Sequence, residues 1–128
     1  QPWQFILVTQ RAHLDELAQI LPYGKMLLQA PLGIVVCGDT RLEQFKKDYW
    51  MLDCSAATQN ILLAAHALGL GAVWIGVFPV EERVRRISLA CDLPGYIIPH
   101  CIIAVGSPAE EKTAVDRYNP QRIHRERW

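Results

Sequence analysis

The sequence has no excess of charge of either sign, because its 128 residues include 13 lysines and arginines and 13 aspartates and glutamates. A net charge of zero gives no electrostatic reason to expect a nucleic acid or an anionic membrane as partner. Apolar runs such as 32–37 and 61–65 are far shorter than the roughly 20 residues that cross a bilayer. No secretory signal pattern opens the chain. We therefore expect a cytoplasmic protein whose partner is a small molecule or another protein.

The sequence also lacks the short paired spacings of zinc sites and disulfide frameworks. Its cysteines are interpreted as reduced packing residues in apolar surroundings; they are Cys37, Cys54, Cys91 and Cys101. Three histidines in different predicted elements are interpreted as surface or core-edge residues; they are His13, His100 and His124. We predict no metal site.

Catalytic motifs of the common hydrolases, phosphotransferases and dinucleotide-binding domains are missing too. Cys54 and His66 lie on one predicted helix, and twelve residues of helix separate them by a rise of about 18 Å, which excludes a nucleophile and base pair. Gly69 and Gly71 follow a predicted helix, whereas the glycine turn of a Rossmann fold follows a strand. What remains is chemistry carried by a cofactor. We predict no side chain that acts as acid, base or nucleophile.

The sequence does contain an alternation of short β-rich runs and helical segments within one predicted domain. The predicted strands cover residues 4–9, 32–37, 72–77 and 97–105, and the predicted helices cover 12–21, 23–29, 50–68 and 80–90. The last three strands are expected to be buried. Turns are expected at 38–40 and 92–95.

The segment 50–68 is the clearest predicted helix, because apolar residues repeat along one stripe at helical spacing. The stripe consists of Ala57, Ile61, Ala64, Ala65 and Leu68. Residues 109–128, in contrast, are polar, densely charged and without an apolar period. Their spaced apolar residues, Tyr118, Ile123 and Trp128, favour an extended C-terminal arm that docks on another subunit.

Three separated segments match the motifs of a known family. Residues 1–5, QPWQF, match the end of an N-x-Q-P-W-x-F segment, and residues 53–60 with 68–76 match a central helix and strand. Residues 106–112 and 116–118 match a C-terminal arm. Together they resemble the nitroreductase family of FMN enzymes, which form intertwined homodimers. The resemblance implies an α+β fold with a central, mainly antiparallel or mixed sheet flanked by helices.

The resemblance also implies which residues contact FMN. Trp74, Ile75 and Gly76 resemble the segment that lies along the isoalloxazine ring, and the missing Cβ of Gly76 suits a close approach of the backbone. An ordinary strand end before a turn is the alternative interpretation. Gln1 corresponds to the family's glutamine beside the ring.

Arg117 is similar to the family's arm arginine that reaches the FMN phosphate. A guanidinium fork suits the phosphate oxygens better than a lysine does. Lys112 and Arg122 are lesser candidates for this contact. The alternative interpretation of Arg117 is a solvated arginine in a tail.

The implied reaction is a ping-pong transfer in which NAD(P)H, the co-substrate, reduces FMN and a nitroaromatic, quinone or similar electrophile is then reduced. The flavin would lie between two subunits, with the 50–68 helix in the dimer interface. A flavin-storage protein without turnover and a cofactor-free dimerisation fragment are the alternatives. Family members usually carry N-terminal helices with an R-R-S-x-R motif before Q-P-W. We therefore expect residues 1–128 to form one nitroreductase-like domain that is N-terminally incomplete.

Overall fold

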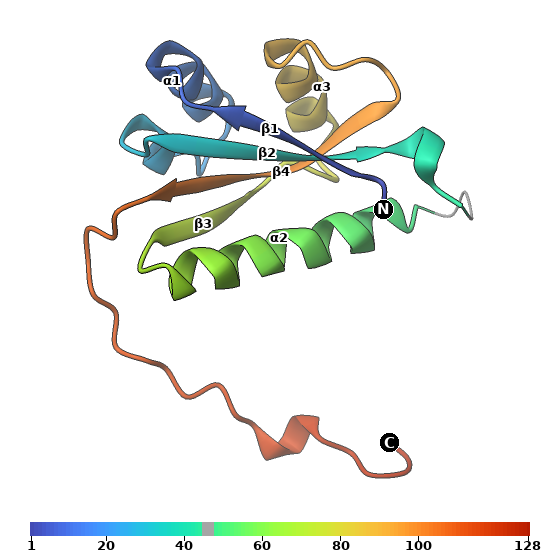
Figure 1. Cartoon of the computed structure of the whole chain (residues 1–128). Coiled ribbons are helices and arrows are strands. Elements are labelled where there is room, and N and C mark those ends of the chain that lie inside the picture. The colour runs from blue at the N-terminus through green and yellow to red at the C-terminus, as the bar shows by residue number, and fades with distance from the viewer. Residues whose placement is uncertain (45–47) are drawn as a thin grey trace.

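The computed structural model describes residues 1–44 and 48–128, and it has the expected α+β fold (Figure 1). The strands are β1 (Trp3–Val8), β2 (Leu32–Asp39), β3 (Gly71–Gly76) and β4 (Ile97–Gly106), and the α-helices are α1 (Arg11–Ile20), α2 (Trp50–Ala67) and α3 (Glu81–Ala90). Short 3-10 helices cover Lys25–Leu28, Thr40–Leu42 and Pro120–Arg122. None of the helices among these residues is long and apolar enough to cross a membrane.

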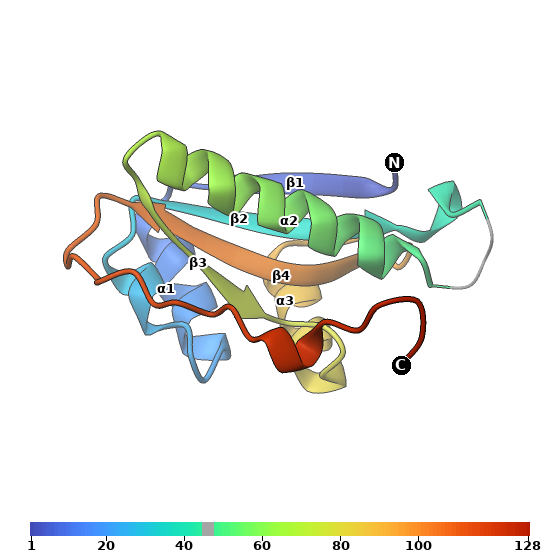
Figure 2. The ribbon, with the colours of Figure 1, turned by 90° about the horizontal axis from the view of Figure 1, so that it is seen from below.

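The four strands form one antiparallel sheet in the order β1-β2-β4-β3. Helices α1 and α3 lie on one face of the sheet and α2 lies along the other, as Figures 1 and 2 show. Because β2 and β4 are central and have helices on both faces, their apolar residues are buried without alternation. The expectation of buried strands at 32–37 and 97–105 is confirmed.

Each face of the sheet has its own apolar core. On the α1 and α3 side, Leu14, Leu17 and Ile87 pack on the sheet. On the α2 side, Trp50 and Cys54 pack against Val36, Cys101 and Ile103 of the sheet. Trp50 is the largest of the fully buried side chains among the described residues. Ala72 of β3 and Phe78, just after this strand, pack against the second core.

The four cysteines are free, and three of them are buried in or beside these cores. Burial raises the pKa of the Cys37 and Cys54 thiols to about 12 and that of the Cys91 and Cys101 thiols to about 11. Thiols with such pKa values are protonated at neutral pH and act as small apolar groups.

Several sequence-based expectations were wrong in detail. The 72–77 strand is buried on one face only: Ile75 and Val77 are in the core, but Val73 is 38% and Trp74 36% exposed, because β3 is an edge strand. The turn expected at 38–40 is wrong, since Gly38 and Asp39 continue β2 by pairing with Ile98 and Ile97. The helix expected at 23–29 is only one 3-10 turn at Lys25–Leu28.

The face of α2 that packs on the sheet also differs from the predicted stripe. Trp50, Cys54, Thr58 and Ala65 are its buried residues. Of the predicted stripe, Ala65 is buried and Leu68 is 75% exposed. The predicted stripe lies partly beside the buried face and leaves apolar side chains in solvent.

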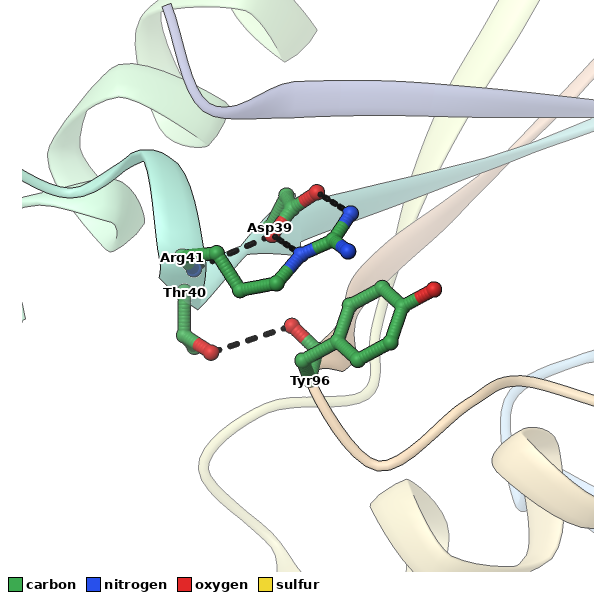
Figure 3. Close-up of polar contacts among 4 residues, drawn as sticks. All are labelled: Asp39, Thr40, Arg41 and Tyr96. Atoms are coloured by element: carbon green, nitrogen blue, oxygen red, sulfur yellow. Dashed lines mark hydrogen bonds and ion pairs between the residues drawn. The ribbon is translucent and has the colours of Figure 1, made fainter.

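The end of β2 is fixed to the start of β4 by a small polar cluster (Figure 3). The Arg41 guanidinium donates to both carboxylate oxygens of Asp39, at 2.7 and 3.0 Å, and lies 3.5 Å above the centre of the Tyr96 ring. The Thr40 hydroxyl and backbone amide both donate to the Tyr96 carbonyl. Asp39 also accepts from the Arg41 backbone amide and so caps the 3-10 helix.

Replacing Asp39 by asparagine should remove the ion pair while keeping a side-chain acceptor for the cap. Hydrogen bonds from Arg41 hold the pKa of Asp39 below its usual range. The pair therefore stabilises the fold at pH values above about 3.9 and loses this effect as the pH falls through the lowered pKa. Urea unfolding should show D39N less stable than the wild type at pH 7, with the gap closing towards pH 3. Asp15→Asn, in an exposed pair with Arg11, is the control and should change little. A gap that does not depend on pH would contradict this assignment.

After β4 the chain leaves the sheet as an extended segment that contains one 3-10 turn, Pro120–Arg122, and continues to Trp128 (Figure 1). Its apolar residues are exposed in the single chain: Tyr118 is 71% and Trp128 100% exposed. The ring of Trp128 stacks on His124 at 4.2 Å within the segment itself.

Candidate functional site

The predicted flavin segment lies at the end of the edge strand β3. Trp74 is opposite Ile103 and Gly76 is opposite Cys101, and both of these partners belong to the core on the α2 side. Ile75 points to the other face and is buried in the core below α1 and α3. Among the described residues β3 pairs only with β4, so its other edge is open to a ligand or a second chain.

Gly76 is exposed, and a Cβ built on it would have no atom within 4 Å. The space beside this residue is therefore open in the single chain. Its carbonyl accepts a hydrogen bond from the Arg83 guanidinium at 3.2 Å, which ties the strand end to α3. A flat ligand could approach this backbone closely, because no side chain keeps it at a distance.

A buried histidine lies directly beside this strand end. His100 Nε2 is 3.0 Å from Ser55 Oγ of α2, and the His100 ring meets the Trp74 ring edge-on at 5.6 Å. Trp50 meets the same imidazole ring at 6.1 Å and the Phe78 ring at 5.0 Å. Burial lowers the pKa of His100 below its ordinary value of 6.5, so the ring is neutral at pH 7.

The sequence interpretation gave His100 no role, because its position depends on a β-bulge. Val36 pairs with Cys101 and Cys37 pairs with Pro99, so His100 is the extra residue of β4 at this point. Such a bulge changes the direction of a side chain, and here it turns His100 towards α2. No periodic pattern in the sequence predicts this bulge. The only local signal is a single histidine within an apolar strand.

Three of the five predicted site residues lie together at the end of β3, and the other two lie on other segments of the chain. Gln1 precedes β1, three strands across the sheet from β3, or about 14 Å at the usual strand spacing. Arg117 is exposed on the arm and forms no ion pair with another described residue. Of the lesser candidates, Lys112 pairs with Glu110 at 2.7 Å and Arg122 is exposed. A single chain therefore leaves the predicted flavin site divided.

Two surface hollows lie elsewhere on the chain. One is bounded by α1 and α3 and is lined by residues such as Glu16 and Arg86. The other, of about 350 Å³, lies beside β1 and is lined by residues such as Phe5, Arg41 and Tyr96. Gly76 lines neither of them.

We compared this chain with known proteins to find the family to which it belongs. The model of the "Nitroreductase family" matches residues 19–107. The chain is 48% identical over 128 residues to a protein of Methanothermobacter thermautotrophicus named "Putative NADH dehydrogenase/NAD(P)H nitroreductase". The match covers all of this chain and 66% of that relative.

Solved structures agree over nearly the whole chain. A Bacteroides thetaiotaomicron protein that carries the same name matches with a TM-score of 0.92 and 46% identity, over 99% of this chain and 73% of its own. An FMN-dependent nitroreductase of Clostridium difficile matches with a TM-score of 0.90 and 32% identity, over 99% of this chain and 76% of its own. The family expected from the three sequence segments is confirmed, and the chain belongs to the nitroreductase family.

Proposed function

We propose that two copies of this chain bind FMN and transfer electrons from NAD(P)H to a nitroaromatic, quinone or similar small electrophile. The observation that carries the proposal is the open backbone at Gly76, on an unpaired strand edge next to the exposed Trp74. The relatives are named as NAD(P)H nitroreductases, and one similar structure is named as FMN-dependent. Bound FMN would supply the chemistry, by accepting and then passing on a hydride equivalent.

The residues at the end of β3 fit such a group. Gly76 allows close contact between the backbone and a flat ring, and the Trp74 side chain adds an apolar surface that is held in place by His100. Ile75 anchors the strand from the buried side. These residues would orient the ring and exclude water from one side of it, and no described side chain is needed as an acid or base.

A second copy of the chain would explain the exposed apolar surface. Leu52, Leu63 and Leu68 of the α2 segment are exposed, as are the apolar residues of the arm. Apolar surface of this kind marks interfaces between subunits. We propose that the arm of one copy, residues 109–128, crosses to the other and brings Arg117 to the phosphate, and that Gln1 approaches the ring across the dimer.

The test is to purify the natural-length protein and record its visible spectrum, its mass in solution and its response to NAD(P)H. We expect a yellow dimer whose flavin absorbance is bleached by NAD(P)H without oxygen and restored by a quinone. A yellow protein that NAD(P)H does not bleach would instead be a flavin-storage protein. A colourless protein that stays monomeric with excess FMN would contradict the proposal.

Replacing Arg117 by alanine should weaken FMN binding by about ten- to a hundredfold, because a charged hydrogen bond to phosphate contributes about 1.5–3 kcal/mol. The dimer should remain folded, since Arg117 is exposed in the single chain. Fluorescence titration with FMN measures the affinity, and light scattering measures the dimer.

The matched control is Arg125→Ala, which removes the same charge from the same arm. It should leave the FMN affinity within about twofold. Equal effects of the two substitutions would mean that the arm contributes only general positive charge, and the assignment of Arg117 would be wrong.

A further inference from the structure

His100 holds the flavin segment from two directions. Its backbone carbonyl accepts hydrogen bonds from the amides of Val77 and Phe78, at 3.2 and 3.0 Å. Its imidazole ring contacts Trp74 edge-on at 5.6 Å. His100 thus contacts the chain on both sides of Gly76: Trp74 before it, and Val77 and Phe78 after it.

The His100 side chain is itself fixed by α2. Its Nε2 atom lies 3.0 Å from Ser55 Oγ, and the Trp50 ring stands nearly perpendicular to the imidazole at 6.1 Å. A neutral imidazole has one donor and one acceptor. The hydrogen bond with Ser55 uses one of them and determines how the ring is turned towards Trp74. The polar part of the link from α2 to the flavin segment is this hydrogen bond, beside the ring contacts of Trp50 with His100 and Phe78.

The other ring nitrogen makes this arrangement unusual for a core residue. Nδ1 is buried and has no hydrogen-bond partner among the described residues, while the whole residue is only 8% exposed. An unpaired buried polar atom costs stability, so a residue with packing as its only role would be better replaced by an apolar one. The contacts of the imidazole ring with Ser55 and Trp74 give a reason for a histidine at this position.

We propose that His100 is a positioning residue of the flavin site, which together with Ser55 sets the place of the Trp74 ring and of the backbone at Gly76. This inference rests on the proposed function, since it takes FMN to be the ligand at this strand end. His100 touches no reacting atom in this scheme and acts through its neighbours. The bulge in β4 is the structural feature that makes the contact possible.

The test compares variants of the natural-length protein in FMN titrations and visible spectra. Ser55→Ala removes the hydrogen bond with little change in volume and should weaken FMN binding by about tenfold. His100→Leu should have a similar effect and shift the flavin absorption band, because the Trp74 ring loses its support. His100→Gln, which can still reach Ser55, should restore most of the affinity. The double variant S55A/H100L should be no weaker than either single variant, because both remove the same contact.

His13→Leu is the control, since His13 is a half-buried histidine of α1 on the opposite side of the sheet. It should leave FMN affinity and spectrum unchanged. Wild-type affinity and spectrum in S55A would overturn the inference, even if H100L fails to fold. A leucine variant that binds FMN as well as the glutamine variant would overturn it too. If the wild-type protein binds no FMN, the proposed function fails, and this inference fails with it.

Discussion

Replacing Gly76 by valine should abolish FMN binding while leaving the chain folded. A Cβ at Gly76 would have no described atom within 4 Å, so the chain leaves room for a side chain to begin there. The backbone there is not in the left-handed region, and valine suits a β-strand. The added methyl groups would keep a flat ring away from the strand edge, and we expect a loss of affinity of more than a hundredfold. FMN titration and thermal unfolding, measured on the same preparation, check both parts of the result.

Gly95→Val gives the matched control. Gly95 also has open space where a Cβ would be placed, but it lies in the turn before β4 and outside the predicted flavin segment. The control should bind FMN like the wild type. If a folded G76V dimer also retained FMN with unchanged affinity, the ring could not lie along this strand. If G76V became monomeric, Gly76 would instead be part of a subunit contact.

The elements that could be predicted from the sequence are those with local signals. The prediction of a helix at 50–68 agrees with α2 to within one residue at its end, because an apolar helical repeat ends at Gly69 and Gly71. The strand predicted at 97–105 agrees equally well with β4, since an apolar run is followed by Gly106 and Pro108. Neither prediction required information about the elements that pack against α2 and β4.

The wrong predictions depend on which elements lie next to one another in the folded chain. The sequence does not show that β3 is at the edge of the sheet, and an apolar run there looks the same as a buried strand. Gly38 and Asp39 look like a turn in sequence, but they remain in β2 because β4 extends far enough to pair with them. The buried face of α2 could not be chosen either, since apolar residues occur on more than one side of that helix.

The candidate site was found through motifs, and periodicity contributed nothing to it. Trp74, Ile75 and Gly76 were selected by resemblance, and the structure adds that their strand end is open. Gln1 and Arg117 stay predictions, because they lie on other segments and no hydrogen bond or ion pair described in the chain joins them to β3. His100 was missed because a bulge between two residue pairs determines where its side chain points. A residue that reaches a site through such an irregularity is visible only in three dimensions.

Replacing Gly38 by alanine should strongly destabilise the fold, in contrast to the effect expected at Gly76. A Cβ on Gly38 would overlap the ring of Trp50, which is fully buried on the α2 side of the sheet. Gly38 is held between Trp3 of β1 and Ile98 of β4, so its backbone cannot move away easily. Overpacking of this kind costs about 1–3 kcal/mol, and we expect the upper end of that range. The midpoint of urea unfolding measures the change.

Gly76→Ala is the control for the loss of a strand glycine, and it should change the unfolding midpoint very little. Combining G38A with Trp50→Leu should recover part of the stability relative to the sum of the single changes, because a smaller side chain leaves room for the methyl group. An unchanged midpoint in G38A would mean that the Trp50 ring has space to shift. The Trp50 ring also contacts Phe78 and His100 at the end of β3. Displacing it should therefore weaken FMN binding as well, and the double variant should regain stability without regaining FMN affinity, because leucine at position 50 makes neither ring contact.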